Sequence, residues 1–359
     1  MAQAMQQHLS LFCHWLYAKL YTYGGISMDD KINQLLREKI QFHYGADINE
    51  AKVYFSTQNY AFIFENKPFM IRVSKTANKS RSEILSELMW LDDLKSFTNT
   101  VCEPHPSLQG NYLEEFDIEG TTYRASMFRT ARGNVKTAVD MNPMFFICVG
   151  ELLGKIHKVS TNEQEIGMHY KRRSLLEKIG LSYEQHRSKL SESELARVNS
   201  IIEKVDSLPK ETGIYGICHG DFHKDNFFVE NNNIWVFDFD SCCYSHYLFD
   251  VATFIQDCLL HGYKAGEDMR KVIYEDIMPY FRIGYELNQN CSESYWDELE
   301  TFIALRAVHS FLALQGISEC GIGVDLDQIK KFYSLIINHE DIIDGITIAL
   351  GGTVKKHNG

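Results

Sequence analysis

The stretch that decides the fold reads His219-Gly220-Asp221-Phe222-His223-Lys224-Asp225-Asn226, and a second stretch soon after it reads Phe237-Asp238-Phe239-Asp240. They place an aspartate, an asparagine five residues later, and a second aspartate beyond one short hairpin. Phosphoryl transfer needs a carboxylate that orients an attacking hydroxyl and oxygen ligands that hold magnesium against nucleotide phosphates. The spacing therefore predicts a phosphoryl-transfer site.

The residues between the two stretches predict a β-hairpin. Two apolar runs, 227–229 and 234–237, flank a polar linker that is rich in asparagine, a residue that tolerates turn dihedrals. Asn232 is midway between Asn226 and Asp238. We therefore expect these two residues to lie nearly opposite each other, where paired Cβ atoms are roughly 4.5–5.5 Å apart.

The hairpin also gives the predicted roles of the acidic residues. Asp240 has the same strand parity as Asp238, so we expect it on the same side as a second carboxylate. We predict that Asp221 is catalytic and that Asn226, Asp238 and Asp240 are metal ligands.

The composition bounds the possible functions. The chain has 359 residues and a formal charge of 36 − 48 = −12, with 45% hydrophobic residues. These values fit one large domain or two lobes and argue against wholesale disorder. The acidic balance argues against a nucleic-acid partner and would suit a cationic small substrate.

The cysteines and the apolar runs indicate where the protein resides. Nine cysteines are scattered without a CxxC motif, which is typical of reduced thiols in the cytoplasm. No apolar run reaches the ~18 residues of a membrane span, so we expect no membrane partner. The aromatic start of the chain lacks a basic n-region and does not match a signal peptide. We treat residues 1–28 as an N-terminal extension, with Met28 as an alternative start.

The hydrophobic periodicity predicts two lobes. An N-terminal lobe over 29–130 is expected to hold helices at 29–44 and 82–94 and strands at 53–55, 60–64, 69–73, 112–116 and 123–128. A lobe over 131–359 is expected to be mainly helical, with strands only at 214–218 and in the hairpin 227–239, and helices at 143–158, 172–205, 247–261, 267–287, 292–315 and 325–338.

These motifs resemble the aminoglycoside phosphotransferase and choline kinase family, a branch of the protein-kinase-like fold. The family's HGDxxxxN loop is similar to residues 219–226, and its apolar strand that ends in Asp is similar to 234–240. Phe249-Asp250-Val251-Ala252 is similar to its downstream structural segment. The resemblance implies an α+β bilobal fold, with a small antiparallel-sheet lobe followed by a larger, mainly helical lobe. It also implies a use of ATP, with GTP as an option, and of Mg²⁺.

The resemblance assigns roles to residues around the loop. Asp221 would orient the substrate hydroxyl and accept its proton, and Asn226 and Asp238 would bind magnesium. His219 would brace the loop, and Asp250 would hold it through backbone hydrogen bonds.

The resemblance also places a nucleotide site in the first lobe. Arg72 stands where the family usually has a phosphate-binding lysine, with Glu87 as its expected partner and Glu83 in reserve, and Lys75 is a further candidate cation. The phosphate-cradling loop has no glycine, so Ser56 or Asn59 would donate side-chain hydrogen bonds instead. Phe128 begins the expected hinge, whose backbone would bind the purine edge.

The acceptor is expected to be a small molecule. Only residues 240–248 separate the hairpin from the next anchored segment, which leaves no room for a protein kinase's activation segment. The acceptor pocket is expected between the hairpin and the helical C-terminal part, which holds Tyr263, Tyr280, Tyr285, Tyr295, Trp296 and Arg306 beside the acids Asp257, Glu267, Asp268, Glu275 and Glu286. Acids that face the pocket would select an amine-bearing acceptor such as an aminoglycoside, an aminocyclitol or an amino alcohol. Two alternatives stay open: a degenerate, non-catalytic nucleotide-binding kinase fold, and a metal-dependent phosphoesterase built from His219, Asp221, His223, Asp225, Asp238 and Asp240.

Overall fold

The computed structural model describes residues 30–55, 59–64, 67–75, 79–134, 141–165, 170–261, 263, 266–317 and 325–354. The prediction for residues 1–28 lies outside this part of the chain. Contacts group the described residues up to Arg132 with Trp235–Asp240, and they group Gly133–Ile234 with the described residues from Ser241 onward. We call these the N-terminal and the C-terminal unit. The predicted lobe limits, 29–130 and 131–359, stay a prediction.

The N-terminal unit is built on an antiparallel sheet, as predicted. The strand order is β1-β2-β3-β6-β4, with β5 paired to β6. The strands are β1 (Ala51–Phe55), β2 (Asn59–Phe64), β3 (Phe69–Lys75), β4 (Pro104–His105), β5 (Glu114–Ile118) and β6 (Thr121–Arg129). The sequence missed β4, because two residues carry no alternation that could reveal a strand.

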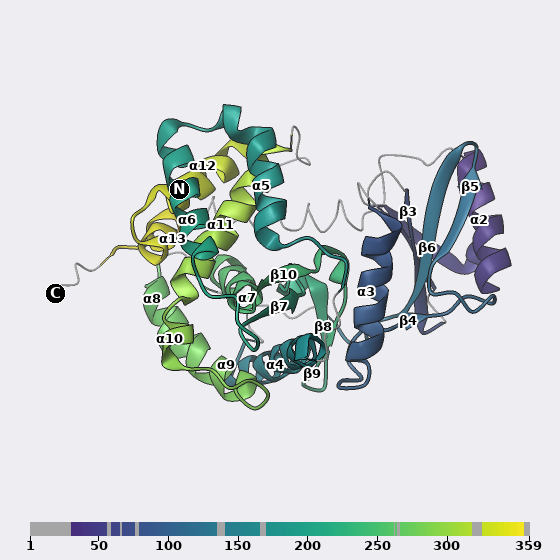
Figure 1. Cartoon of the computed structure of the whole chain (residues 1–359), viewed down its shortest axis with the longest axis horizontal. Coiled ribbons are helices and arrows are strands. Elements are labelled where there is room, and N and C mark those ends of the chain that lie inside the picture. Colours follow the sequence, from purple (N-terminus) through teal and green to yellow (C-terminus); the bar gives the residue numbers. More distant parts are fainter. Residues whose placement is uncertain are drawn as a thin grey trace. The chain divides into compact units, whose positions relative to one another are not determined.

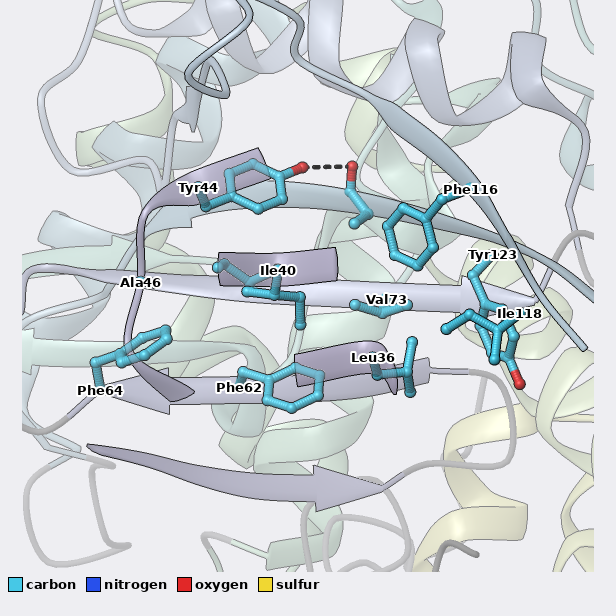
Figure 2. Packing of buried hydrophobic residues seen from close by; sticks show 12 residues of the cluster. Leu36, Ile40, Tyr44, Ala46, Phe62, Phe64, Val73, Phe116, Ile118 and Tyr123 are labelled. Atoms are coloured by element: carbon cyan, nitrogen blue, oxygen red, sulfur yellow. Dashed lines mark hydrogen bonds between the residues drawn. The ribbon is translucent and has the colours of Figure 1, made fainter. Parts of the chain in front are cut away.

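One face of this sheet carries the hydrophobic core of the unit. Helix α2 (Asp30–Tyr44) packs Leu36 and Ile40 against it, and both side chains are fully buried. Figure 2 shows the cluster that they form with sheet residues such as Phe62 and Val73. The Tyr44 hydroxyl donates a 2.8 Å hydrogen bond to the Ala125 carbonyl oxygen, which ties the end of the helix to β6.

The opposite face of the sheet is covered by α3 (Arg81–Leu94), so the two helices lie on different sides of it (Figure 1). A capping box between Ser80 and Glu83 begins the helix. Because side chains alternate along a strand, Arg72 points away from Ile71 and Val73, which lie in the α2 core. The arginine therefore lies on the face that α3 covers.

The C-terminal unit is mainly helical, as predicted. Its helices are α4 (Pro143–Glu165), α5 (Leu175–His186), α6 (Glu192–Asp206), α7 (Leu248–His261), α8 (Met269–Lys271), α9 (Met278–Tyr285), α10 (Glu293–Trp296), α11 (Leu299–Gln315), α12 (Leu326–Asn338) and α13 (Ile342–Ala349). Short 3₁₀ helices lie in this unit at Arg187–Lys189 and Lys224–Asn226, in the N-terminal unit at Ile48–Glu50, and at the boundary of the two units at Phe239–Ser241. A π-helical segment, Val272–Ile277, joins α8 to α9.

Two helix predictions need correction, and one helix was not predicted. The single helix expected over 172–205 is two helices, because Leu190 is extended and Ser191 starts α6 with its own capping box to Glu194. The helix expected over 292–315 is likewise divided into α10 and α11. Helix α13 was missed, although Asp341 caps its N-terminus.

Two small two-stranded sheets follow in this part of the chain. Strand β7 (Tyr215–Cys218) pairs antiparallel with β10 (Cys243–His246), a strand that the sequence did not predict. Strands β8 (Phe227–Glu230) and β9 (Asn233–Val236) form the predicted hairpin. Asn231 and Asn232 have φ values of 50° and 65°, which match the type I′ turn that favours asparagine.

The end of this hairpin differs from the prediction. Strand β9 stops at Val236, Asp238 has a φ of 62°, and residues 239–241 form a 3₁₀ turn. The strand-parity argument that placed Asp240 beside Asp238 is therefore wrong, since parity holds only along an extended strand. That Asn226 and Asp238 lie opposite each other stays a prediction.

Two further properties concern the described part of the chain. No helix there is long and apolar enough to cross a membrane. Its cysteines are free thiols, and most of them are buried.

Candidate active site

The loop that begins at His219 is fixed by one buried carboxylate. Asp250, in the first turn of α7, accepts backbone hydrogen bonds from His219 at 2.7 Å and from Gly220 at 2.8 Å. Gly220 has a φ of 82°, and a Cβ there would lie 2.4 Å from the Ser241 carbonyl oxygen. Only glycine fits this position. The role expected of Asp250 is confirmed, and the buried His219 ring braces the loop by accepting the Asp221 amide at 3.3 Å.

Asp221 stands at the centre of a charged cluster in the C-terminal unit. One of its oxygens lies 2.9 Å from Arg306 Nη2, and the other lies 3.3 Å from His223 Nε2. About a third of the Asp221 side chain (32%) is exposed, so a small molecule can reach it. We call Asp221, His223, Asn226 and Arg306 the aspartate site.

The charges of the aspartate site alter its acid–base properties. Burial acts to raise the pKa of Asp221, but the nearby charges of His223 and Arg306 outweigh it and hold the pKa far below its usual value. Burial acts to lower the pKa of His223, yet Asp221, Asp257 and Asp225 raise it to about 9. Near neutral pH the site thus holds an ionised aspartate between two cations.

Asn226 is oriented by the same loop. Its Nδ2 donates to the Asp221 carbonyl oxygen at 2.8 Å and lies 3.1 Å from His223 Nε2. This contact commits the amide nitrogen, so the amide oxygen is the atom that would bind a cation. Lys224, in the same loop, pairs with Asp225 at 2.8 Å.

A second cluster lies in the N-terminal unit around Arg72. Arg72 Nη2 binds Glu87 Oε2 at 2.8 Å, which confirms the expected ion pair, whereas the reserve candidate Glu83 is used in the α3 cap. Asp240 Oδ1 lies 3.7 Å from Arg72 Nη1 and 2.5 Å from Lys79 Nζ. We call Arg72, Lys79, Glu87 and Asp240 the arginine site.

The arginine site keeps its central cation charged. Burial acts to lower the pKa of Arg72, but Glu87, Asp240 and Asp238 together raise it. The Phe128 ring lies 4.8 Å from the guanidinium carbon of Arg72. Phe128 therefore contacts the phosphate-site candidate through its ring, whereas its expected role as a hinge residue stays a prediction.

Lys79 is a member of this site that the sequence did not reveal. It precedes α3 and also donates to the Asp240 carbonyl oxygen at 2.5 Å. The candidate named from the sequence, Lys75, is instead exposed at the end of β3. Nothing in the local pattern separates the two lysines, because Lys79 meets Asp240 across 161 residues of chain.

Asp238 has a strained backbone. It is one of few non-glycine residues in the described chain with a positive φ, and such strain is often found at functional sites. The next residue, Phe239, is buried and packs edge-on against Trp90 of α3, with ring centroids 5.2 Å apart. The carboxylates of Asp238 and Asp240 and the amide of Asn226 offer oxygen atoms, the ligand type that Mg²⁺ prefers, so these residues fit the implied ion chemically.

The remaining nucleotide candidates are less informative. Ser56 lies outside the described residues. Asn59 is half-buried at the start of β2, where it pairs with Ser74 in the sheet register. Their role in binding phosphates stays a prediction.

Most residues proposed for the acceptor pocket have other partners. Tyr285, Tyr295 and Trp296 are buried in the helical core, the position that is most common for such aromatics. Among the acids, Asp268 caps α8 by accepting the backbone amide of Lys271. Glu275 pairs with the Lys271 side chain, and Glu286 pairs with Arg282.

A buried cluster lies behind the loop. His157, Cys218 and Asp250 have their ligand-type atoms within 4.8 Å of one another, and it is the one such group found among the described residues. His157 also contacts the Tyr285 hydroxyl at 2.7 Å and the Asp250 carboxylate at 3.2 Å. Because Asp250 already binds two loop amides, this cluster supports the loop and does not match the dinuclear metal site considered above.

The fold and the loop define a class of protein, the small-molecule kinases. The chain belongs to the phosphotransferase enzyme family, whose model matches residues 47–271. The amicoumacin kinase of Bacillus subtilis (strain 168) is 23% identical over 266 residues, which are 73% of this chain and 79% of that protein. Membership of this family favours a small-molecule kinase over the phosphoesterase and the non-catalytic alternatives.

Solved structures share the fold. An amicoumacin kinase, hAmiN, in complex with AMP-PNP, Ca²⁺ and Ami, matches with a TM-score of 0.75 and 20% identity, over 88% of this chain and 97% of that one. A microcompartment-associated aminopropanol kinase matches with a TM-score of 0.64 and 17% identity, over 88% and 99%. These similarities bear out the kinase-like fold.

Proposed function

We propose that this protein transfers the γ-phosphate of ATP to a hydroxyl group of a small, amine-bearing molecule. The observation that carries the proposal is the geometry of Asp221, a partly exposed carboxylate on a loop that Asp250 fixes through two backbone amides. GTP is the alternative donor. In this proposal residues 29–130 bind the nucleotide and residues 131–359 bind the acceptor.

The low pKa of Asp221 indicates how it would act. A carboxylate that is hard to protonate is a weak base, so it would orient the acceptor hydroxyl and not retain its proton. Phosphoryl transfer mainly requires alignment and charge neutralisation, because its transition state is loose and has little covalent chemistry for the protein to perform. Asp221 would thus aim the acceptor oxygen at the γ-phosphorus.

The arginine site would hold the donor. Arg72, kept charged by Glu87, would bind phosphate oxygens through its planar fork, with Ser56, Asn59 and Phe128 as further nucleotide contacts. Asn226, Asp238 and Asp240 would hold Mg²⁺, which when bound supplies positive charge that offsets the charge of the phosphates. The free, mostly buried thiols are compatible with the cytoplasm, which is the proposed location.

Support for an amine in the acceptor comes from relatives. The names of an aminopropanol kinase and of a spectinomycin phosphotransferase among the structural matches refer to amine-bearing acceptors, although identities of 17% and 16% carry only the fold to this chain. The net charge of −12 would favour the approach of a cation. The amine therefore stays a proposal.

A nucleotide-consumption screen tests the proposal. The full chain would be incubated with ATP or GTP and Mg²⁺ against aminoglycosides, choline analogues, amino alcohols, homoserine and neutral sugars, and the products would be identified by mass. We expect acceptor-dependent consumption and a product heavier by one phosphoryl group. Phosphorylation of neutral sugars alone would contradict the amine. A lack of any thermal stabilisation by nucleotide with Mg²⁺ would contradict the donor assignment.

A further inference from the structure

Arg306 is held from two sides at the aspartate site. Its Nη2 lies 2.9 Å from Asp221 Oδ1, and its Nη1 lies 3.3 Å from Nδ1 of His309, one turn further along α11. Burial, together with the charges of Arg306 and Lys178, lowers the pKa of His309 to about 4. The ring is therefore neutral near pH 7, and its Nδ1 accepts a hydrogen bond from the guanidinium.

This position limits what can bind next to Asp221. An acceptor hydroxyl on the carboxylate lies roughly 2.7 Å from its oxygen, so the acceptor atoms next to that hydroxyl fall within reach of Arg306. A guanidinium carries five N–H donors, of which Asp221 and His309 take one each. The fork therefore retains donors for an oxygen of the acceptor, whereas an ammonium group there would be repelled.

The surroundings point the same way. Lys178 adds a second positive charge that acts on His309. Of the acids expected to select an amine, Glu275 and Glu286 pair with Lys271 and Arg282, and Asp268 accepts the backbone amide of Lys271. Asp257 acts on His223, on the side of Asp221 away from Arg306, and accepts the backbone amide of Lys224. The side of Asp221 that Arg306 occupies is thus positive, and the amine of an acceptor would bind on another side.

We propose that Arg306 is an acceptor-contacting residue that selects molecules with a carboxylate or amide oxygen beside the reacting hydroxyl. The proposal rests on the proposed function, because it assumes that Asp221 orients that hydroxyl. It narrows the acceptor class from amino alcohols in general to hydroxy amino acids and their amides.

Matched acceptors test this selection. L-serine and L-serinamide are compared with ethanolamine, and L-threonine and L-threoninamide with 1-amino-2-propanol. Within each set the carbon that bears the amine carries a carboxylate, a carboxamide or only hydrogen, and the rest of the molecule is the same. For the unaltered protein we expect kcat/KM to be at least about tenfold higher for the acceptors with a carboxylate or carboxamide group than for the parent amino alcohols. This ratio is typical of one hydrogen bond to a charged group.

Variants separate selection from support. Arg306→Gln is expected to lower kcat/KM more for the acceptors with a carboxylate or carboxamide than for the parent amino alcohols. The ratio of the two kcat/KM values should then fall to within about twofold of unity. Arg306→Lys keeps the charge but loses the fork, so it should retain part of the preference for the carboxylates and lose that for the amides. The matched control is Arg282→Gln, which removes a guanidinium that pairs with Glu286 and Glu293 away from the loop. It should keep the full preference.

Other outcomes would overturn the proposal. An equal loss in Arg306→Gln for both members of each set would mean that the arginine only supports Asp221. A preference of the unaltered protein for the parent amino alcohols would also refute it.

A labelling experiment tests the inference when no acceptor is turned over, a result that would count against the proposed function. Serinamide should slow the phenylglyoxal modification of Arg306, measured by peptide mass with Arg282 as the reference, and ethanolamine should not. Equal labelling rates would refute the selection.

Discussion

The arginine site and the aspartate site have opposite arrangements of charge. In the first, carboxylates surround a buried cation, because Glu87 and Asp240 both contact Arg72. In the second, cations surround a carboxylate, because Arg306 and His223 contact both oxygens of Asp221. Each unit thus contains one central charge together with the counter-charges that hold it in position.

This difference agrees with the role proposed for each site. Arg72 is held charged and rigid, as a residue that binds phosphate should be. Asp221 is held ionised but partly exposed, as a residue that orients a hydroxyl should be. A change in the aspartate site should therefore act mainly on turnover, and a change in the arginine site mainly on nucleotide binding and stability.

The largest expected effect comes from Asp221→Asn. The amide cannot orient the acceptor hydroxyl as an ion does, so we expect kcat to fall by about 10²–10⁴-fold while nucleotide affinity changes little. Steady-state kinetics and a nucleotide titration measure the two quantities. Asp225→Asn is the matched control, because Asp225 lies in the same loop but pairs with Lys224. Unchanged turnover in Asp221→Asn would show that Asp221 does not orient the acceptor hydroxyl, and the proposed difference in role between the two sites would then be wrong.

The second effect concerns Glu87. Glu87→Gln leaves Arg72 buried without its main counter-charge, so we expect a loss of about 3 kcal/mol in the free energy of unfolding and a weaker affinity for nucleotide. Denaturant titration and nucleotide binding measure the two effects. Glu83→Gln is the control one turn earlier on α3, because glutamine also completes a capping box. Equal stability of the two variants would show that Glu87 does not hold Arg72.

The sequence predicted the parts of both sites that depend on short spacing. The loop from His219 to Asn226 and the turn at Asn231 and Asn232 follow from neighbours in the chain, and both were found as expected. The pairing of Arg72 with Glu87 also followed, since a strand and the next helix are separated by only 15 residues.

The parts that the sequence missed depend on contacts between distant residues. Lys79 meets Asp240 across 161 residues. Arg306 was expected in the acceptor pocket, but its contact with Asp221 from α11 was not predicted. Composition cannot tell such a lysine or arginine from a solvated one, because its partner is determined by the fold. The positive φ of Asp238 was also hidden, since the apolar pattern of 234–237 favoured a continuous strand.

A smaller effect tests the assignment of Asp240. If Asp240 is a magnesium ligand, Asp240→Asn should raise the Mg²⁺ concentration for half-maximal activity by about tenfold, because a charged oxygen ligand is replaced by a neutral one. Lys79→Met removes the cation that contacts Asp240 but leaves the carboxylate, so it should shift the Mg²⁺ requirement far less. Equal shifts in the two variants would show that Asp240 serves to bind Lys79 and not the ion.

The smallest expected effect is an acid dependence of stability at the aspartate site. The pKa of His309 in the folded chain is about 4, below the usual value of about 6.5, so the fold favours the neutral ring. The stabilisation of the fold by the neutral His309 ring is complete above pH 6.5 and is lost as the pH falls toward 4. The reason is that His309 takes up its proton at a higher pH in the unfolded chain than in the folded chain. We expect a loss on the order of 1–3 kcal/mol across this window.

The share of His309 in this acid dependence can be separated from that of other titrating groups. The pKa of Asp221 is also lowered in the folded state, so its own contribution is lost only below its usual value of about 3.8, outside the His309 window. Other buried histidines with lowered pKa values, His157, His186 and His246, add to the same slope. Denaturant titrations of the unaltered protein and of His309→Gln at pH 7.5 and pH 4.5 isolate its share. We expect the stability difference between the two pH values to shrink in His309→Gln. An unchanged difference would mean that His309 has the same pKa in the folded and in the unfolded chain, so that the fold does not favour the neutral ring that accepts from Arg306.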